Sequence, residues 1–155
     1  MHIVFDKDTG LLIPGEYKLS IKEFEKEFVT NEERRIIFKG FQKLIKIFTA
    51  IECEYLYADG SFVTKKPFPS DIDVCWHMHN ESSKRDQQLE ALLKICPPLF
   101  FLNKIENREY IQKEFCADVF PANTKERDSG LLFKDFFQKD KHTDEPKGII
   151  VIDLL

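Results

Sequence analysis

The segment that decides the fold of this chain is residues 60–73, which read GSFVTKKPFPSDID. A Gly-Ser pair after a strand-like run makes a tight turn whose backbone N–H groups and hydroxyl can hold phosphate oxygens. The acids that close the segment are Asp71 and Asp73. Residues two apart in a strand face the same side, so we expect two carboxylates together, about 6–7 Å apart along the strand. Such carboxylates suit hard cations such as Mg²⁺, and a pair of these ions can hold the attacking and leaving oxygens of a phosphoryl or nucleotidyl transfer.

The residues that alternate with these acids predict where the helices pack. Ile72, Val74 and Trp76 should point to the opposite face of the sheet. The strongest helical pattern lies at about 31–52, where apolar residues recur at helical spacing, including Phe41. We expect this apolar stripe to cover the face opposite the acids.

A third carboxylate is expected on a neighbouring strand. Asp118 is a lone acid within the apolar run 115–120, where a carboxylate is costly unless it meets a cation. Glu114 is the weaker candidate, because it lies at the end of a predicted helix where water reaches it. We expect the carboxylates of Asp71, Asp73 and Asp118 to converge beside the Gly-Ser turn.

The rest of the chain indicates alternating helices and strands, which is typical of an α/β or α+β fold. The first 19 residues read as an extended arm with turns, and capping boxes at 20–23 and 30–33 predict two helix starts. Further strands are predicted at about 53–58, 72–78, 115–120 and 148–152, and further helices near 89–96, 103–114 and 131–137.

Composition limits the classes to which this protein can belong. A length of 155 residues fits a single domain, 1–155, and 43% apolar residues suffice for a core. A net charge of -4 argues against general binding to long nucleic acid, and 18 Lys against 5 Arg leave few planar phosphate clamps. We find no apolar run of the ~18 residues that a membrane span needs and no signal-peptide pattern.

The cysteines indicate a reducing compartment. Cys53, Cys75, Cys96 and Cys116 show no zinc-ribbon spacing, so we interpret them as free, mostly buried thiols of a cytoplasmic protein. A zinc site made by Cys75, His77 and His79 is disfavoured, since three ligands from one strand diverge.

These motifs resemble the polymerase-β-like nucleotidyltransferase superfamily, whose signature is a Gly-Gly or Gly-Ser turn, a gap of about ten residues, Asp-x-Asp and a later third acid. The matching positions are Gly60-Ser61, Asp71, Asp73 and Asp118 within a motif core at about 53–120. The chain is similar to the small stand-alone members, the minimal nucleotidyltransferases of prokaryotic toxin–antitoxin and defence systems. It also looks like a poorly characterised prokaryotic and phage family of that superfamily.

The resemblance implies a mixed sheet with helices on one face and the acids on the other. It implies transfer of a nucleoside monophosphate from a nucleoside triphosphate to a hydroxyl of a protein or RNA acceptor. Asp71, Asp73 and Asp118 would bind Mg²⁺ or Mn²⁺, and Asp118 would also help to activate the acceptor hydroxyl. Gly60 and Ser61 would hold the β- and γ-phosphates.

Two questions stay open from the sequence. Lys65 and Lys66 are candidates for neutralising the triphosphate, although a solvated loop explains them equally well. The alternative to an enzyme is a catalytically silent binding protein of the same fold, antitoxin-like or phage-encoded, that uses its Phe-rich C-terminal half. No appended helical domain is visible to grip base and acceptor, which favours the binder or the need for a protein partner or a second copy of the chain.

Overall fold

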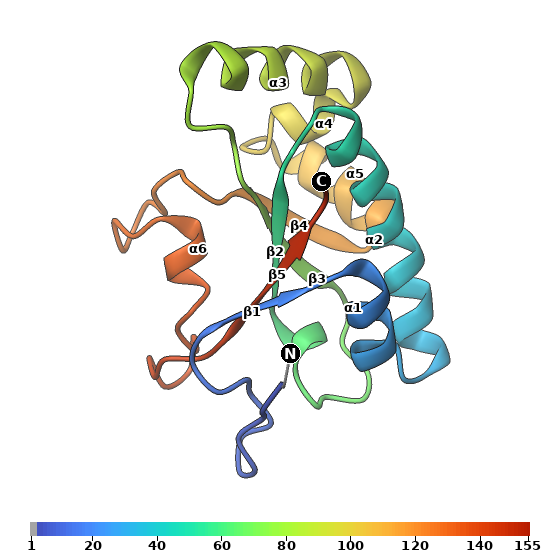
Figure 1. Ribbon diagram of the computed structural model, residues 1–155, viewed down its shortest axis with the longest axis vertical. Coiled ribbons are helices and arrows are strands. Elements are labelled where there is room, and N and C mark those ends of the chain that lie inside the picture. The colour runs from blue at the N-terminus through green and yellow to red at the C-terminus, as the bar shows by residue number, and fades with distance from the viewer. Residues whose placement is uncertain (1–2) are drawn as a thin grey trace.

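The computed structural model describes residues 3–155, so the first two residues of the predicted arm lie outside the described part of the chain. A five-stranded sheet forms the centre of the molecule, with the strand order β1-β5-β2-β3-β4 (Figure 1). Its strands are β1 (Glu16–Leu19), β2 (Tyr55–Asp59), β3 (Ile72–Trp76), β4 (Ala117–Pro121) and β5 (Ile149–Asp153). The sheet is mixed, because β5 and β3 are antiparallel to β2, whereas β1 is parallel to β5 and β4 is parallel to β3. The predicted α+β class is confirmed.

Helices cover the two faces of this sheet unequally. The larger group is α1 (Ile21–Phe28), α2 (Glu32–Ala50), α3 (Ser82–Ile95), α4 (Pro97–Phe100) and α5 (Ile105–Phe115). The remaining helices are the 3₁₀ turn η1 (Ser61–Val63), which follows β2, and the short α6 (Phe133–Phe136). Figure 1 shows α1, α2 and α5 on one side of the sheet and α6 on the other.

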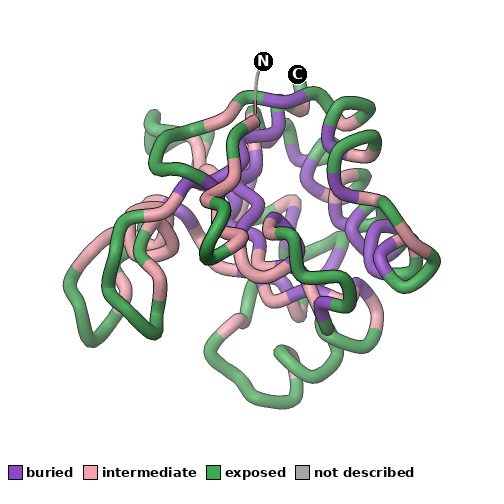
Figure 2. The backbone as a smooth tube through the Cα atoms, turned by 90° about the horizontal axis from the view of Figure 1, so that it is seen from below, coloured by how far each residue is buried: buried purple, intermediate pink, exposed green. Residues whose placement is uncertain are grey.

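The main core lies between the sheet and the larger helix group. Ile72, Val74 and Trp76 belong to one buried cluster with Phe41, which is 0% exposed. The predicted packing of the 31–52 helix on the face opposite the acids is therefore confirmed. The buried stretches gather in the centre of the molecule, and exposed loops surround them (Figure 2).

A second, smaller apolar cluster covers part of the opposite face. Tyr57 and Cys75 lie there with residues of β5, and Phe120, Phe133 and Phe137 pack against them. The rings of Phe120 and Phe133 stack with their centres 4.9 Å apart. The acid-bearing face is thus closed at one end by the segment that carries α6, and only the rest of it is free to form a site.

Several predicted boundaries need correction. The arm before residue 19 ends in a true strand, β1, because its backbone pairs with β5 at the edge of the sheet. The cap of α2 is Asn31, whose side chain accepts from the Arg34 N–H, and not Thr30. The predicted capping box at Ser20 and Glu23 is confirmed.

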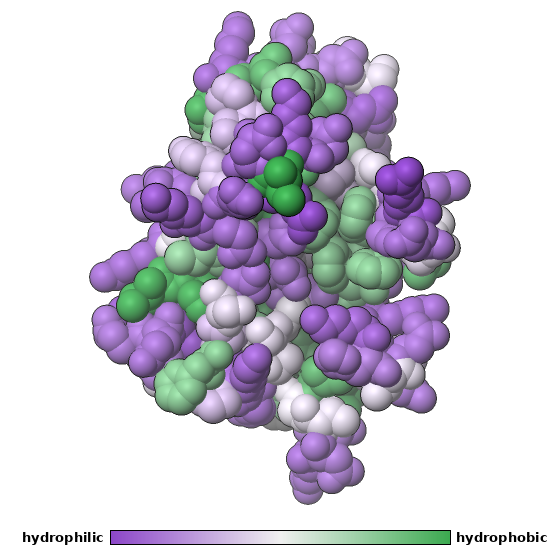
Figure 3. Space-filling model, turned by 180° about the vertical axis from the view of Figure 1, so that it is seen from behind, coloured by the Kyte–Doolittle hydropathy of each residue, from purple (hydrophilic) through white to green (hydrophobic). Residues whose placement is uncertain are grey.

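Three further findings concern membrane-spanning helices, cysteines and the surface. Among residues 3–155, no helix combines the length and the apolar character that a membrane crossing requires. The four cysteines are free, as predicted, and three of them are buried. Hydrophilic side chains cover most of the face seen in Figure 3, between scattered apolar residues.

Candidate functional site

Three aspartates form a row across the free face of the sheet. Asp59 on β2 pairs in register with Asp73 on β3, and Asp73 pairs in register with Asp118 on β4. Residues that pair directly across neighbouring strands point to the same face. We call these three residues the acid row. We expected Asp71 and Asp73 to share one face of a strand. β3 begins at Ile72, so Asp71 lies in the loop that precedes the strand.

The turn after β2 is shaped around one member of the acid row. Gly60 has φ +81°, which side-chain-bearing residues rarely adopt. A Cβ atom at this position would lie 2.5 Å from Asp73 Oδ2. Both the backbone conformation and the close carboxylate therefore require glycine, and the Gly60-Ser61 turn lies directly beside the acids as predicted.

A buried arginine fixes this turn to the helical layer. Arg34 of α2 is 2% exposed, and its guanidinium donates to the backbone carbonyls of Phe28 at 2.9 Å, Phe62 at 2.7 Å and Thr64 at 3.0 Å, and also to that of Lys66. Its charge therefore meets carbonyl dipoles and no carboxylate. Burial lowers the pKa of Arg34, although an arginine stays protonated. The loop that starts with the Gly-Ser turn is thus bound to α2 mainly through this one side chain.

Asp59 carries a carboxylate with little compensation. It is 1% exposed, and neither of its carboxylate oxygens has a hydrogen-bond partner. Lys147 Nζ lies 3.5 Å from Oδ1, close enough for an ion pair but long for a hydrogen bond. Burial raises the pKa of Asp59 to about 6, and Lys147 opposes this rise. The row therefore holds excess negative charge in a water-poor place.

Asp73 is perturbed in the same direction and for a related reason. Its burial raises its pKa to about 7, and repulsion from Asp71, Asp59 and Asp118 adds to the rise. A cluster of carboxylates that repel one another resists ionisation until a cation joins them. Strongly perturbed acids beside a cleft are typical of functional sites.

The outer acids are held by side chains of α5. Arg108 Nη2 donates to Asp118 Oδ2 at 2.8 Å, and Gln112 Nε2 donates to Asp71 Oδ2 at 2.6 Å. Within residues 3–155, no group of three or more His, Cys, Asp or Glu side chains is placed to hold a metal ion. The expected convergence of Asp71, Asp73 and Asp118 is not seen in these side-chain positions, in which Asp71 and Asp118 contact α5 instead. The ligand roles of Asp71, Asp73 and Asp118 stay predictions.

The chemistry of the donors still fits a divalent cation. The acid row and Asp71 offer only carboxylate oxygens, which Mg²⁺ and Mn²⁺ prefer. The carboxylate oxygens of Asp59 accept no hydrogen bond and have only the 3.5 Å ion pair with Lys147 to offset their charge. Asp71 and Asp73 would hold such an ion, with Asp59 behind them and Asp118 available once Arg108 releases it.

A cleft of about 1110 Å³ opens beside the acids and the turn. Asp59, Asp71, Asp73, Gly60 and Ser61 all line it. Its basic residues are Lys65, Lys66, Lys139, Lys141, His142 and Lys147. Six aspartates also line the cleft, so its five lysines offer local positive charge beside a comparable number of carboxylates. The structure thus brings the predicted residues Lys65 and Lys66 to the same cleft as the acids, although Lys65 Nζ lies 4.5 Å above the ring of Phe5.

Two residues of the site escaped the sequence analysis. The strand predicted at 53–58 stops one residue short of Asp59, yet the alternation of Tyr55, Tyr57 and Asp59 already predicts that these side chains share a face. Arg34 gave no signal, because nothing in a helical pattern tells which arginine donates to a distant loop. The disfavoured zinc site stays without support, since His77 stacks on Tyr55 with ring centres 4.4 Å apart.

Comparison with known proteins places the chain in a family. Residues 3–153 match the family described as "Family of unknown function (DUF6932)", and the chain belongs to it. No curated protein and no solved structure matches the chain.

Arg34→Met tests whether one guanidinium holds the turn. The change leaves four backbone carbonyls without their donor, and we expect the free energy of unfolding to fall by about 3 kcal/mol or more. Arg35→Met is the matched control, because Arg35 is 42% exposed and pairs only with Glu25 at the surface. Chemical denaturation should show a loss below about 1 kcal/mol for the control. Equal losses in both variants would show that Arg34 has no special role.

The raised pKa values of Asp59 and Asp73 predict a pH dependence of stability. A carboxyl whose pKa is higher in the folded chain stabilises the fold when protonated, and this contribution is lost as the pH rises through the folded pKa. In EDTA, the free energy of unfolding should fall as the pH rises from about 4, where the carboxyls of the unfolded chain ionise, and should level off above about 7. Asp73→Asn should flatten this fall, whereas Asp86→Asn, on the exposed side of α3, should follow the wild type. Parallel curves for all three proteins would contradict the charge repulsion.

Proposed function

We propose that this member of DUF6932 is a metal-dependent nucleotidyltransferase that moves a nucleoside monophosphate from a nucleoside triphosphate to a hydroxyl of a protein or RNA. The observation that carries the proposal is the position of Asp59, Asp71 and Asp73 beside the Gly60-Ser61 turn in one lysine-lined cleft. Asp118 pairs in register with Asp73 on β4 but lies outside the lining of that cleft. The resemblance to polymerase-β-like nucleotidyltransferases agrees with this arrangement.

The residues of the cleft would divide the work by their chemistry. Asp71 and Asp73 would hold the divalent cation, which when bound supplies positive charge to the triphosphate and to the developing charge on the leaving group. Backbone N–H groups at Gly60 and Ser61 would donate to the β- and γ-phosphates. Lys66, Lys139 and Lys141 would reduce the remaining negative charge, since all three line the same cleft.

The transfer balances without any further reactant. The acceptor oxygen forms a bond to the α-phosphorus while the bond from that phosphorus to the oxygen bridging the α- and β-phosphates breaks. The proton of the acceptor hydroxyl passes to a carboxylate, for which Asp118 is the proposed base once it is free of Arg108. Pyrophosphate leaves with the bond's electron pair.

The double variant Asp71→Asn and Asp73→Asn tests this proposal. It keeps side-chain size but removes two charges, so transfer should fall by at least about 100-fold. The measurement is label transfer from α-labelled nucleoside triphosphates in Mg²⁺ or Mn²⁺, with host-cell extract supplying protein and RNA acceptors. Asp86→Asn with Glu90→Gln is the control, because it removes two charges from exposed positions of α3.

The fold itself should tolerate the double variant. Without a metal, removing mutually repelling charges should keep or raise the melting temperature. Metal-dependent transfer that the double variant retains would contradict the proposed roles of the two acids.

A second candidate function has one observation in its favour. Arg108 already pairs with Asp118. A binding protein without catalytic activity could keep this ion pair permanently, because it would not need Asp118 as a metal ligand or base. This candidate predicts that the wild type binds a triphosphate or a partner without turnover, and that the double variant keeps the biological effect.

A further inference from the structure

α5 places two polar side chains against the candidate site from the same side. Arg108 and Gln112 are four positions apart, so they lie one above the other on one helix face. Arg108 contacts Asp118, and Gln112 contacts Asp71. Neither residue belongs to the lysine-lined cleft, and both line a separate open groove of about 630 Å³ along α5, together with Asp118. The acids therefore lie between two differently lined surfaces.

The position of α5 is fixed by close packing. A Cβ at Gly40 of α2 would overlap the backbone carbonyl of Phe115, at the end of α5, so the two helices meet where one has no side chain. Lys43 and Glu114 pair across the same contact at 3.1 Å. A helix held in this way presents Arg108 and Gln112 at defined positions, and the two contacts are not accidents of a loose segment.

The ion pair between Arg108 and Asp118 contributes little to the stability of the fold. The side chain of Arg108 is 52% exposed, and ion pairs so open to water contribute about 0–1 kcal/mol to folding. The positive charge of Arg108 has a larger effect on the acid row, because the negative charge of Asp118 repels that of Asp73 and raises the pKa of Asp73. Arg108 is the cation nearest to this end of the acid row among the described ion pairs.

We propose that Arg108 and Gln112 are positioning residues that hold Asp118 and Asp71 apart, and that a divalent cation must displace Arg108 from Asp118 to complete its set of carboxylates. The inference rests on the cation binding of the proposed function. The inference explains why the carboxylates suit a divalent cation although, among residues 3–155, no three metal-ligating side chains lie close enough together to hold one. Arg108, once displaced, still lines the groove along α5 beside Asp118.

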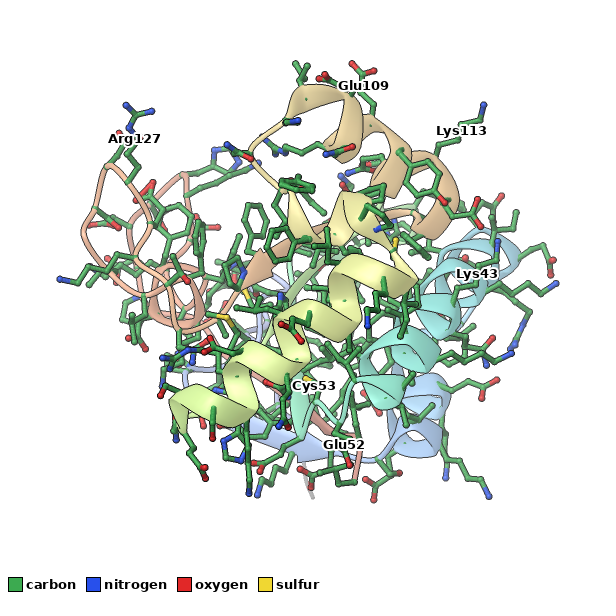
Figure 4. The ribbon with its side chains drawn as sticks, turned by 90° about the horizontal axis from the view of Figure 1, so that it is seen from above. Lys43, Glu52, Cys53, Glu109, Lys113 and Arg127 are labelled. Carbon is green, nitrogen blue, oxygen red and sulfur yellow. The ribbon has the colours of Figure 1, made fainter. Side chains whose placement is uncertain are left out.

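The test is a titration of the full chain with Mn²⁺ alone, followed by calorimetry or by the electron paramagnetic resonance signal of free Mn²⁺. Arg108→Gln removes the competing charge, and it should tighten Mn²⁺ binding about 5-fold. Arg108→Lys keeps the charge and should bind Mn²⁺ like the wild type. Lys113→Gln is the matched control on the same helix, since Lys113 lines the same groove but forms none of the described ion pairs with the acids. Figure 4 shows its side chain projecting outward. This control should change the affinity less than 2-fold.

Two further variants separate charge from orientation. In an Asp118→Asn background the effect of Arg108→Gln should vanish, because the carboxylate for which the two cations compete is gone. Gln112→Ala frees Asp71 without changing any charge, and it should also tighten Mn²⁺ binding. Thermal melts of all variants should stay close to the wild type, since both α5 side chains are exposed.

The outcomes distinguish this inference from the proposed function. If Asp73→Asn abolishes Mn²⁺ binding but Arg108→Gln behaves like Lys113→Gln, the proposed cation site stands and the positioning role of Arg108 is wrong. Weaker binding by Arg108→Gln would also overturn that role. If the wild type binds no Mn²⁺, or if Asp73→Asn leaves binding unchanged, both the inference and the cation site of the proposed function fail.

Discussion

The guanidinium of Arg34 is the contact on which the geometry of the candidate site depends. It joins α2 to the loop after β2 through the three backbone carbonyls of Phe62, Thr64 and Lys66, and it also donates to the carbonyl of Phe28 at the end of α1. Asn31 adds a hydrogen bond to the carbonyl of Pro67 at 2.7 Å. This loop carries the Gly60-Ser61 turn and leads to Asp71. The guanidinium also lies 4.9 Å above the ring of Phe62. A buried cation that meets carbonyl dipoles and an aromatic ring fixes a backbone without neutralising any acid of the site.

The buried negative charge of the acid row perturbs the protonation of its members. Asp59 and Asp73 face each other on neighbouring strands, and burial raises the pKa of both carboxyls to about 6 and about 7. The protein already opposes the charge at both ends, with Lys147 against Asp59 and Arg108 against Asp118. Asp73, in the middle, has no such partner among the described ion pairs and lies against Gly60. An arrangement with cations at its ends and a gap at its centre is what a site for a mobile divalent cation requires.

The sequence predicted those features that follow from local periodicity. Alternation around Asp73 predicted which residues face the helices, and the helical stripe with Phe41 predicted what covers them. Features that depend on distant partners were beyond such reasoning. β1 is a strand because β5 offers it an edge with which to pair, and β3 begins at Ile72, one residue after Asp71. The contacts of Arg108 and Gln112 arise from the packing of α5 on α2, which no spacing within α5 itself reveals.

The central claim is that Asp71 and Asp73 hold a divalent cation beside the Gly60-Ser61 turn. The most direct measurement is the anomalous difference density of crystals grown with MnCl₂ and a non-hydrolysable nucleoside triphosphate. The account predicts a manganese peak within about 2.2 Å of carboxylate oxygens of both aspartates, with the triphosphate in the lysine-lined cleft. A peak elsewhere on the molecule, or a bound triphosphate with no manganese between these two residues, would contradict the account.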